Sequence, residues 1–117
     1  MRILFDSKKQ EFKAPFGCLM PGQRCTLSIH IPETVGATKA VCLLQKEDGT
    51  PAAEVTMTRQ DAKGAYDIFS GSFRLESRGL YFYYFRIYKA NGSFRLFKQG
   101  NDTNMEAGDL WQLSVIP

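Results

Sequence analysis

The sequence predicts an all-β protein folded as a β-sandwich, on three observations. Hydrophobic residues recur with a period of two in most segments, which is the period of a half-buried strand. Turn signals rich in Gly, Pro, Asn and Asp separate these segments about every ten residues. No segment carries the hydrophobic stripe of an amphipathic helix. Roughly seven strands at this spacing are typical of two packed antiparallel sheets.

Four strands are predicted in the first two thirds of the chain. The clearest one alternates apolar and polar residues from Cys25 to Ile31, with His30 on the polar side, and ends at Pro32. A polar loop is expected through Lys63-Gly64, and Gly71 is a candidate β-bulge. The four predicted strands cover residues 25–31, 40–45, 54–58 and 66–73.

The segment 79–88 is the most aromatic of the chain, with six aromatic residues among ten, and the hairpin signal Asn91-Gly92 follows it. Alternation along a strand assigns these residues to two faces. Because an arginine is rarely buried without a partner, the face that carries Arg86 is expected to point outward. Tyr81 or Tyr83 is expected to bond its hydroxyl to backbone as a tyrosine corner. The inward set is Tyr81, Tyr83, Phe85 and Ile87, together with Leu27, Ile29, Ile31, Val41 and Leu43; the outward set is Phe82, Tyr84, Arg86 and Tyr88.

The last part of the chain is predicted to hold a strand at 94–97, a polar loop at 98–109 and a final strand at 111–116. In the final strand, Trp111 shares a face with Leu113 and Val115. The core is therefore the expected position of Trp111, and a surface platform for a sugar is the alternative.

Length and composition predict one soluble domain, residues 1–117, with a core of its own, since 44% of the residues are apolar. The net charge of +3 comes from scattered residues, which argues for neither a nucleic-acid nor a membrane partner. No apolar stretch approaches the roughly 18 residues of a membrane span. The first residues meet a charge too early for a signal peptide. Three cysteines, an odd number, are typical of free thiols in a reducing compartment, so a cytoplasmic location is expected.

Catalytic, metal-binding and cofactor-binding motifs are absent from this sequence. The single histidine, His30, has no nucleophile motif near it, and the three cysteines lack zinc spacing. Residues 101–106 are rich in oxygen ligands, but Met105 and a missing glycine break the calcium-loop pattern. Residues 78–85 match an RNA-recognition consensus at four positions only, and that fold needs two helices, which the sequence does not predict. We therefore expect no cofactor and no nucleic-acid partner.

A set of motifs follows a fixed order through nearly the whole chain. Its members are Ala14-Pro15-Phe16-Gly17, Ile29-His30-Ile31-Pro32, Ala40-Val41-Cys42-Leu43, Tyr66-Asp67-Ile68-Phe69, Gly79-Leu80-Tyr81-Phe82-Tyr83-Tyr84-Phe85 and Leu110-Trp111-Gln112-Leu113-Ser114-Val115. This ordered set resembles the N-terminal immunoglobulin-like domain of bacterial α-amylase-family enzymes (glycoside hydrolase family 13) of the neopullulanase, pullulanase and cyclomaltodextrinase type. Such domains are similar to carbohydrate-binding module family 34.

The resemblance implies an immunoglobulin-like β-sandwich of about seven or eight antiparallel strands. It implies a parent hydrolase acting on α-glucans, whose catalytic carboxylates lie on the barrel that follows such a domain. This chain alone is therefore not expected to be an enzyme, and none of its residues is assigned a catalytic role. The expected function is an accessory domain that packs on its own catalytic barrel or on a second subunit. The alternatives are a weak module for starch, glycogen or maltooligosaccharides, and an unrelated immunoglobulin-like interaction domain.

The candidate residues for carbohydrate binding or for an interface are the outward set of the aromatic strand. Phe82, Tyr84 and Tyr88 offer rings to the C–H face of a sugar or to a protein partner, and Arg86 offers donors. Trp111 joins them as the alternative platform. In carbohydrate-binding module family 48, a relative of family 34, pairs of tryptophans bind the sugar. These pairs have no match here, since the chain has one tryptophan.

Overall fold

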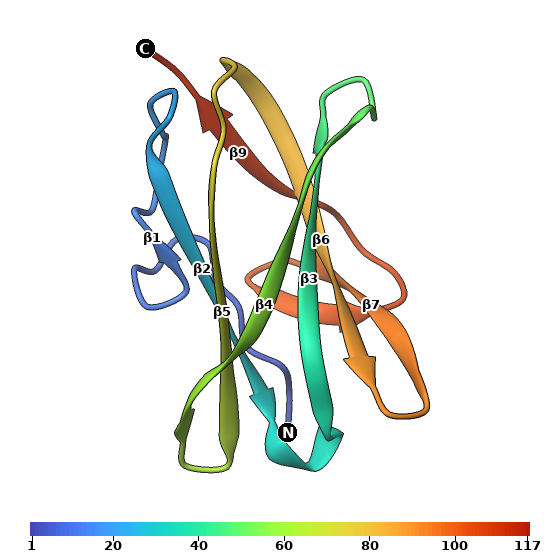
Figure 1. Ribbon diagram of the computed structural model, residues 1–117. Helices are drawn as coiled ribbons and strands as arrows, with labels where there is room; N and C mark the ends of the chain where they lie inside the picture. The colour runs from blue at the N-terminus through green and yellow to red at the C-terminus, as the bar shows by residue number, and fades with distance from the viewer.

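The computed structural model describes residues 1–117 and contains nine β-strands and one short 3-10 helix, η1 (Figure 1). The all-β prediction is confirmed. The elements are β1 (Lys13–Ala14), β2 (Arg24–Pro32), η1 (Glu33–Val35), β3 (Ala37–Lys46), β4 (Pro51–Lys63), β5 (Tyr66–Arg74), β6 (Gly79–Lys89), β7 (Gly92–Gln99), β8 (Asp102–Met105) and β9 (Trp111–Val115).

The strands form two antiparallel sheets that are joined by β4 (Figure 1). Sheet A contains β1, β2, β5 and the second half of β4. Sheet B contains the first half of β4 followed by β3, β6, β7 and β8. β9 lies beside β6 on the same edge as β7, because β9 pairs with residues 79–83 and β7 with residues 85–89.

Strand β4 passes from one sheet to the other near its middle. Its residues 51–57 pair with β3, and its residues 58–63 pair with β5, with a register shift between Arg59 and Asp61. The predicted polar loop before Gly64 is therefore wrong. The backbone of this polar segment is hydrogen-bonded to β5 while its side chains remain in solvent, so the absence of apolar alternation did not prevent a strand.

The expected β-bulge at Gly71 is also wrong, since Gly71 pairs in register with Leu27 of β2. The lack of a side chain at Gly71 instead leaves room for β4 where it passes from one sheet to the other. A Cβ atom at this position would lie 2.6 Å from the carbonyl oxygen of Thr56 and 3.0 Å from Cγ of Met57. The glycine therefore permits the close approach of two backbones.

The two faces of β6 are as predicted. Tyr81, Tyr83, Phe85 and Ile87 are buried, and the residues between them are half-buried on the outer surface. The prediction for β3 is wrong by one position, because Cys42 pairs with Phe85 and so shares its inward face. The inward residues of β3 are Ala40, Cys42 and Leu44, whereas Val41 and Leu43 lie on the outer face opposite Arg86 and Tyr84.

The centre of the core is a cluster of aromatic rings around Phe5. The ring centroid of Phe5 lies 4.9 Å from Phe85 and 5.1 Å from Trp111, in edge-to-face geometry. Tyr83 stacks on Trp111 at 5.8 Å. Pairs of this kind contribute about 0.5–1.5 kcal/mol each beyond their buried area. The N-terminal segment, which the sequence analysis did not assign to an element, is therefore part of the core.

The hydroxyl of Tyr81 donates a 2.7 Å hydrogen bond to the carbonyl oxygen of Ser77, four residues upstream. This is the tyrosine corner, and Tyr81 rather than Tyr83 forms it. The hydroxyl of Tyr83 is buried without a hydrogen-bond partner, although Ser7 lies near enough to influence its pKa. Burial raises the pKa of Tyr83 well above its usual value.

The predicted hairpin after β6 forms one residue earlier than expected. Lys89 pairs with Gly92, so the loop consists of Ala90 and Asn91. The polar loop predicted at 98–109 is interrupted by β8, whose Thr103 side chain is buried and donates to the carbonyl oxygen of Ile3. A short polar strand of this kind has no hydrophobic period that sequence reasoning could detect.

The two core tyrosines provide a matched pair of variants. Tyr81→Phe removes the corner hydrogen bond and is expected to lower the free energy of unfolding by about 0.5–1.5 kcal/mol. Tyr83→Phe removes a buried hydroxyl that bonds to nothing and is expected to leave stability unchanged or raised. Urea unfolding of both variants measures the difference. Equal losses in the two variants would contradict the assigned corner.

Gly71→Ala tests the close approach of β4 and β5. The added methyl group meets backbone that cannot move freely, so a loss of about 1–3 kcal/mol in the free energy of unfolding is expected. Ser72→Ala, at the adjacent exposed position of β5, is the control and is expected to cost less than about 1 kcal/mol. Thermal or urea unfolding measures both, and a Gly71→Ala variant as stable as the control would refute the explanation.

Candidate functional site

The predicted surface residues of β6 come together on the outer side of sheet B. Tyr84, Arg86 and Tyr88 alternate with the buried rings, and the pairing register adds residues from both neighbouring strands. We call this surface the aromatic face. It consists of Tyr84, Arg86 and Tyr88 of β6, Lys39, Val41 and Leu43 of β3, and Arg95 and Phe97 of β7.

The rings of the aromatic face are ordered by contacts with one another and with cations. Tyr84 stacks on Phe97 with 5.3 Å between ring centroids and 21° between ring planes. The guanidinium of Arg95 lies 5.4 Å from the centroid of Phe97, and the amine of Lys39 lies 4.7 Å from that of Tyr88. Such cation–π contacts hold the charges beside the rings at the surface.

The aromatic face carries positive charges that have no acidic partner. Arg86 lies directly opposite Arg95 in the register, and its guanidinium donates only to the hydroxyl of Ser93, at 3.1 Å. The three ion pairs of the structure lie elsewhere. Glu54 lies on β4, two strands away from Arg86, and its partner on β3 is Leu43. Like charges directly opposite in a sheet destabilise it, and a second such pair, Arg24 opposite Arg74, lies on the outer side of sheet A.

The outer side of sheet A differs in chemistry. Its central positions are hydroxyl side chains that bond in pairs, Thr26 with Ser72 and Ser28 with Ser70, each at 2.8 Å. A polar sheet face of this kind is suited to solvent. The two outer faces therefore differ chiefly in their aromatic rings, which sheet B carries and the centre of sheet A lacks.

The two remaining predicted candidates are placed differently: Trp111 lies in the core, and Phe82 lies beside the aromatic face. Trp111 is 2% exposed and packs against Phe5 and Tyr83, so the alternative of a surface platform is wrong and its ring belongs to the core. Phe82 is half-buried and pairs with Gln112 of β9, where it lines a separate cavity of about 560 Å³. Phe82 therefore lies on the same outer side of β6 as Tyr84, but its neighbouring strand there is β9 and not β7.

Sequence reasoning missed several members of the aromatic face, among them Phe97, Arg95, Lys39 and Leu43. For β7 the signal was partial: a hairpin loop of Asn91-Gly92 would put Arg95 on the outward face but opposite Tyr88, whereas the observed loop places it opposite Arg86. For β3 the signal was weak, because residues 40–44 are apolar on both faces. Lys13 is a buried polar residue outside this site. Its amine donates to the carbonyl oxygens of Pro15 and Gly17 at 2.9 and 2.8 Å and so stabilises the loop that contains them.

The expected surface position of His30 is wrong. His30 is buried because Leu4 pairs with it and the ring of Phe12 lies 4.6 Å from its imidazole. Cys25 and Cys42 are buried free thiols, and burial raises the pKa of both. No group of three or more His, Cys, Asp or Glu side chains is arranged to hold a metal ion. The structure contains no helix long and apolar enough to cross a membrane.

Fold and site together define a β-sandwich domain with one hydroxyl-rich outer face and one aromatic, cationic outer face. A solved structure with a similar fold is that of a cyclomaltodextrinase, which aligns with 99% of this chain at a TM-score of 0.69 and 15% sequence identity. This chain spans 19% of that protein's length. No protein-family description and no curated protein sequence matches the chain. The likeness is therefore one of fold.

The single histidine predicts a pH dependence of stability. Burial lowers the pKa of His30 below its ordinary value of 6.5, so the unfolded chain binds more protons on acidification. The contribution of His30 is complete above about pH 6.5 and is lost as the pH falls through the lower pKa of the folded state. The free energy of unfolding should therefore fall more steeply between about pH 7.5 and pH 5 in the natural chain than in His30→Gln. Parallel curves from chemical unfolding would contradict this assignment.

Proposed function

We propose that this chain is a non-catalytic accessory domain of an α-amylase-family glycoside hydrolase that acts on α-glucans. The observation that carries the proposal is the fold similarity along 99% of the chain to a segment of a cyclomaltodextrinase. The order of sequence motifs, which resembles the N-terminal domains of such enzymes, supports it independently. The domain is proposed to act in the cytoplasm, without a cofactor.

The aromatic face is the surface that we assign to this role, as the contact with the catalytic barrel or with a second subunit. Half-buried rings beside unpaired arginines are typical of the central residues of protein interfaces. A partner that presents a carboxylate to Arg86 and Arg95 would relieve their mutual repulsion. On assembly, the accessory domain would therefore gain the acidic partner that Arg86 and Arg95 lack in the isolated domain.

Charge reversal at Arg95 tests this assignment in the parent enzyme. Arg95→Glu places a carboxylate opposite Arg86, so the isolated domain should be stabilised by about 0.2–1 kcal/mol. The same change should weaken domain or subunit association by about tenfold or more, because the proposed partner is acidic. Sedimentation velocity on the enzyme and urea unfolding of the domain measure the two effects.

Arg24→Glu is the matched control, since Arg24 is an exposed arginine on the outer side of sheet A. It should leave association within about twofold of the natural enzyme. Equal effects of the two reversals on assembly would refute the aromatic face as the interface.

Weak glucan binding is the second candidate, and the stacked pair of Tyr84 and Phe97 beside arginine donors favours it. Titration with maltoheptaose should then shift the amide signals of Phe82, Tyr84 and Tyr88 in nuclear magnetic resonance spectra. Absence of any shift at about 10 mM sugar would exclude this role for the domain, since even weak binding at a Kd near 1 mM would be nearly saturated.

A further inference from the structure

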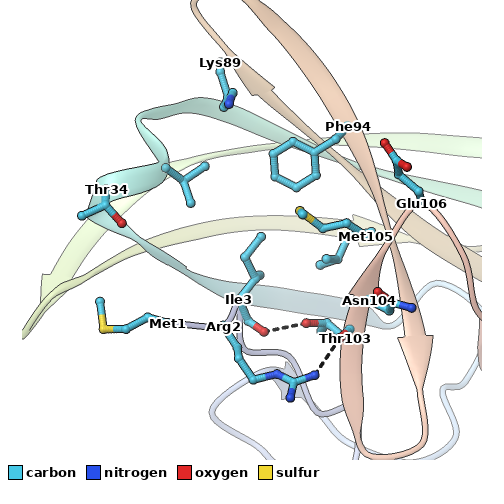
Figure 2. A pocket seen from close by; sticks show the side chains of 12 residues that line it. Met1, Arg2, Ile3, Thr34, Lys89, Phe94, Thr103, Asn104, Met105 and Glu106 are labelled. Carbon is cyan, nitrogen blue, oxygen red and sulfur yellow. Dashed lines mark hydrogen bonds between the residues drawn. The ribbon is translucent and has the colours of Figure 1, made fainter.

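A cavity of about 520 Å³ opens at the end of the sandwich that carries the N-terminus, away from the C-terminus (Figures 1 and 2). Its walls come from the N-terminal segment, η1, the hairpin strands β6 and β7, and β8. No residue of the aromatic face lines it. We propose that this cavity binds a small amphipathic carboxylate, with its apolar chain inside and its carboxylate on Lys89. This inference does not depend on the proposed function.

The interior of the cavity is apolar and open to solvent at its rim. Ile3 and Leu96 are buried beneath it, and the ring of Phe94 forms one wall (Figure 2). Met1 is 75% exposed and Met105 is 57% exposed, so two of the five exposed large hydrophobic residues of the chain lie here. Flexible thioether side chains adapt to an apolar ligand, and exposed apolar walls in a cavity of this size are typical of a ligand site.

The charged side chains of the cavity are Arg2, Lys89 and Glu106, and since Arg2 pairs with Asp102 at 3.5 Å, Lys89 is the cation free to bind an anionic head group. Lys89 is half-buried and pairs with no acidic side chain, and Glu106 of the same cavity does not pair with it either. In Figure 2, Lys89 lies at the upper edge of the lining residues, above Thr34 and Phe94. Glu106 is exposed, so water screens its charge. Lys89 is half-buried, so water screens the charge of Lys89 less and its attraction for an anion is stronger. A carboxylate at this point completes a charge-assisted hydrogen bond that no protein group supplies.

The walls are held in place without a ligand. Thr103 donates a 2.7 Å hydrogen bond to the carbonyl oxygen of Ile3, and Arg2 donates to the carbonyl oxygen of Thr103 at 3.3 Å (Figure 2). These bonds fix β8 to the N-terminal segment on one side of the cavity. Glu106 has a φ of 74° and is the one non-glycine residue with a positive φ. Backbone strain of this kind concentrates at functional sites, and here it turns the chain at the rim.

Three eight-carbon probes with different head groups test the proposal on the 117-residue chain. Sodium octanoate should shift the backbone amide signals of cavity residues, and its affinity should exceed that of octylammonium by about tenfold or more because of Lys89. The affinity of octan-1-ol should lie between the affinities of octanoate and octylammonium. Lys89→Gln should weaken octanoate binding about tenfold and remove the preference for the anion, while Lys46→Gln, at an exposed site outside the cavity, should change neither.

Three results would overturn the proposal: no amide shift at about 5 mM octanoate, equal affinities for the three probes, or shifts centred on the aromatic face. The spectrum of each variant reports its fold, so a loss of binding in Lys89→Gln cannot be confused with unfolding. Octanoate binding needs no parent enzyme. Its failure is therefore distinguishable from failure of the assembly test with Arg95→Glu.

Discussion

The packing of the inward rings of β6 against Phe5 and Trp111 is the constraint on which the rest of the structure depends. Phe5 comes from the N-terminal segment and Trp111 from the last strand, β9, so both ends of the chain are fixed to the same central strand. Because alternate side chains point to opposite faces, burying Tyr83 and Phe85 forces Tyr84 and its outward neighbours to the surface. The aromatic face is thus the necessary other side of the core.

The sequence was sufficient for the parts of the fold that local alternation determines. The fold class, the faces of β6 and the outward position of Arg86 follow from a period of two and from the cost of burying an unpaired charge. It was insufficient where both faces of a strand are apolar, as in residues 40–44, or where neither is, as in β8 and the end of β4. In those segments pairing with distant strands decides the structure, and the sequence carries no period that reports it.

The same distinction explains which site residues could be found. Tyr84, Arg86 and Tyr88 lie on one strand, so their common face follows from spacing alone. The core position of Trp111 likewise followed from its alternation with Leu113 and Val115. Burial of His30 depends instead on the N-terminal segment, whose contacts join residues far apart in the chain. The cavity near Lys89 has walls from four separate parts of the chain, so no sequence motif could have indicated it.

Strand β7 links the two surfaces to which we assign binding. Its residues Phe94 and Leu96 point inward to the cavity, while Arg95 and Phe97 point outward to the aromatic face. A single strand therefore contributes alternate side chains to both. Substitutions at alternate positions of β7 separate the two surfaces, because a change in an outward side chain leaves the inward wall in place.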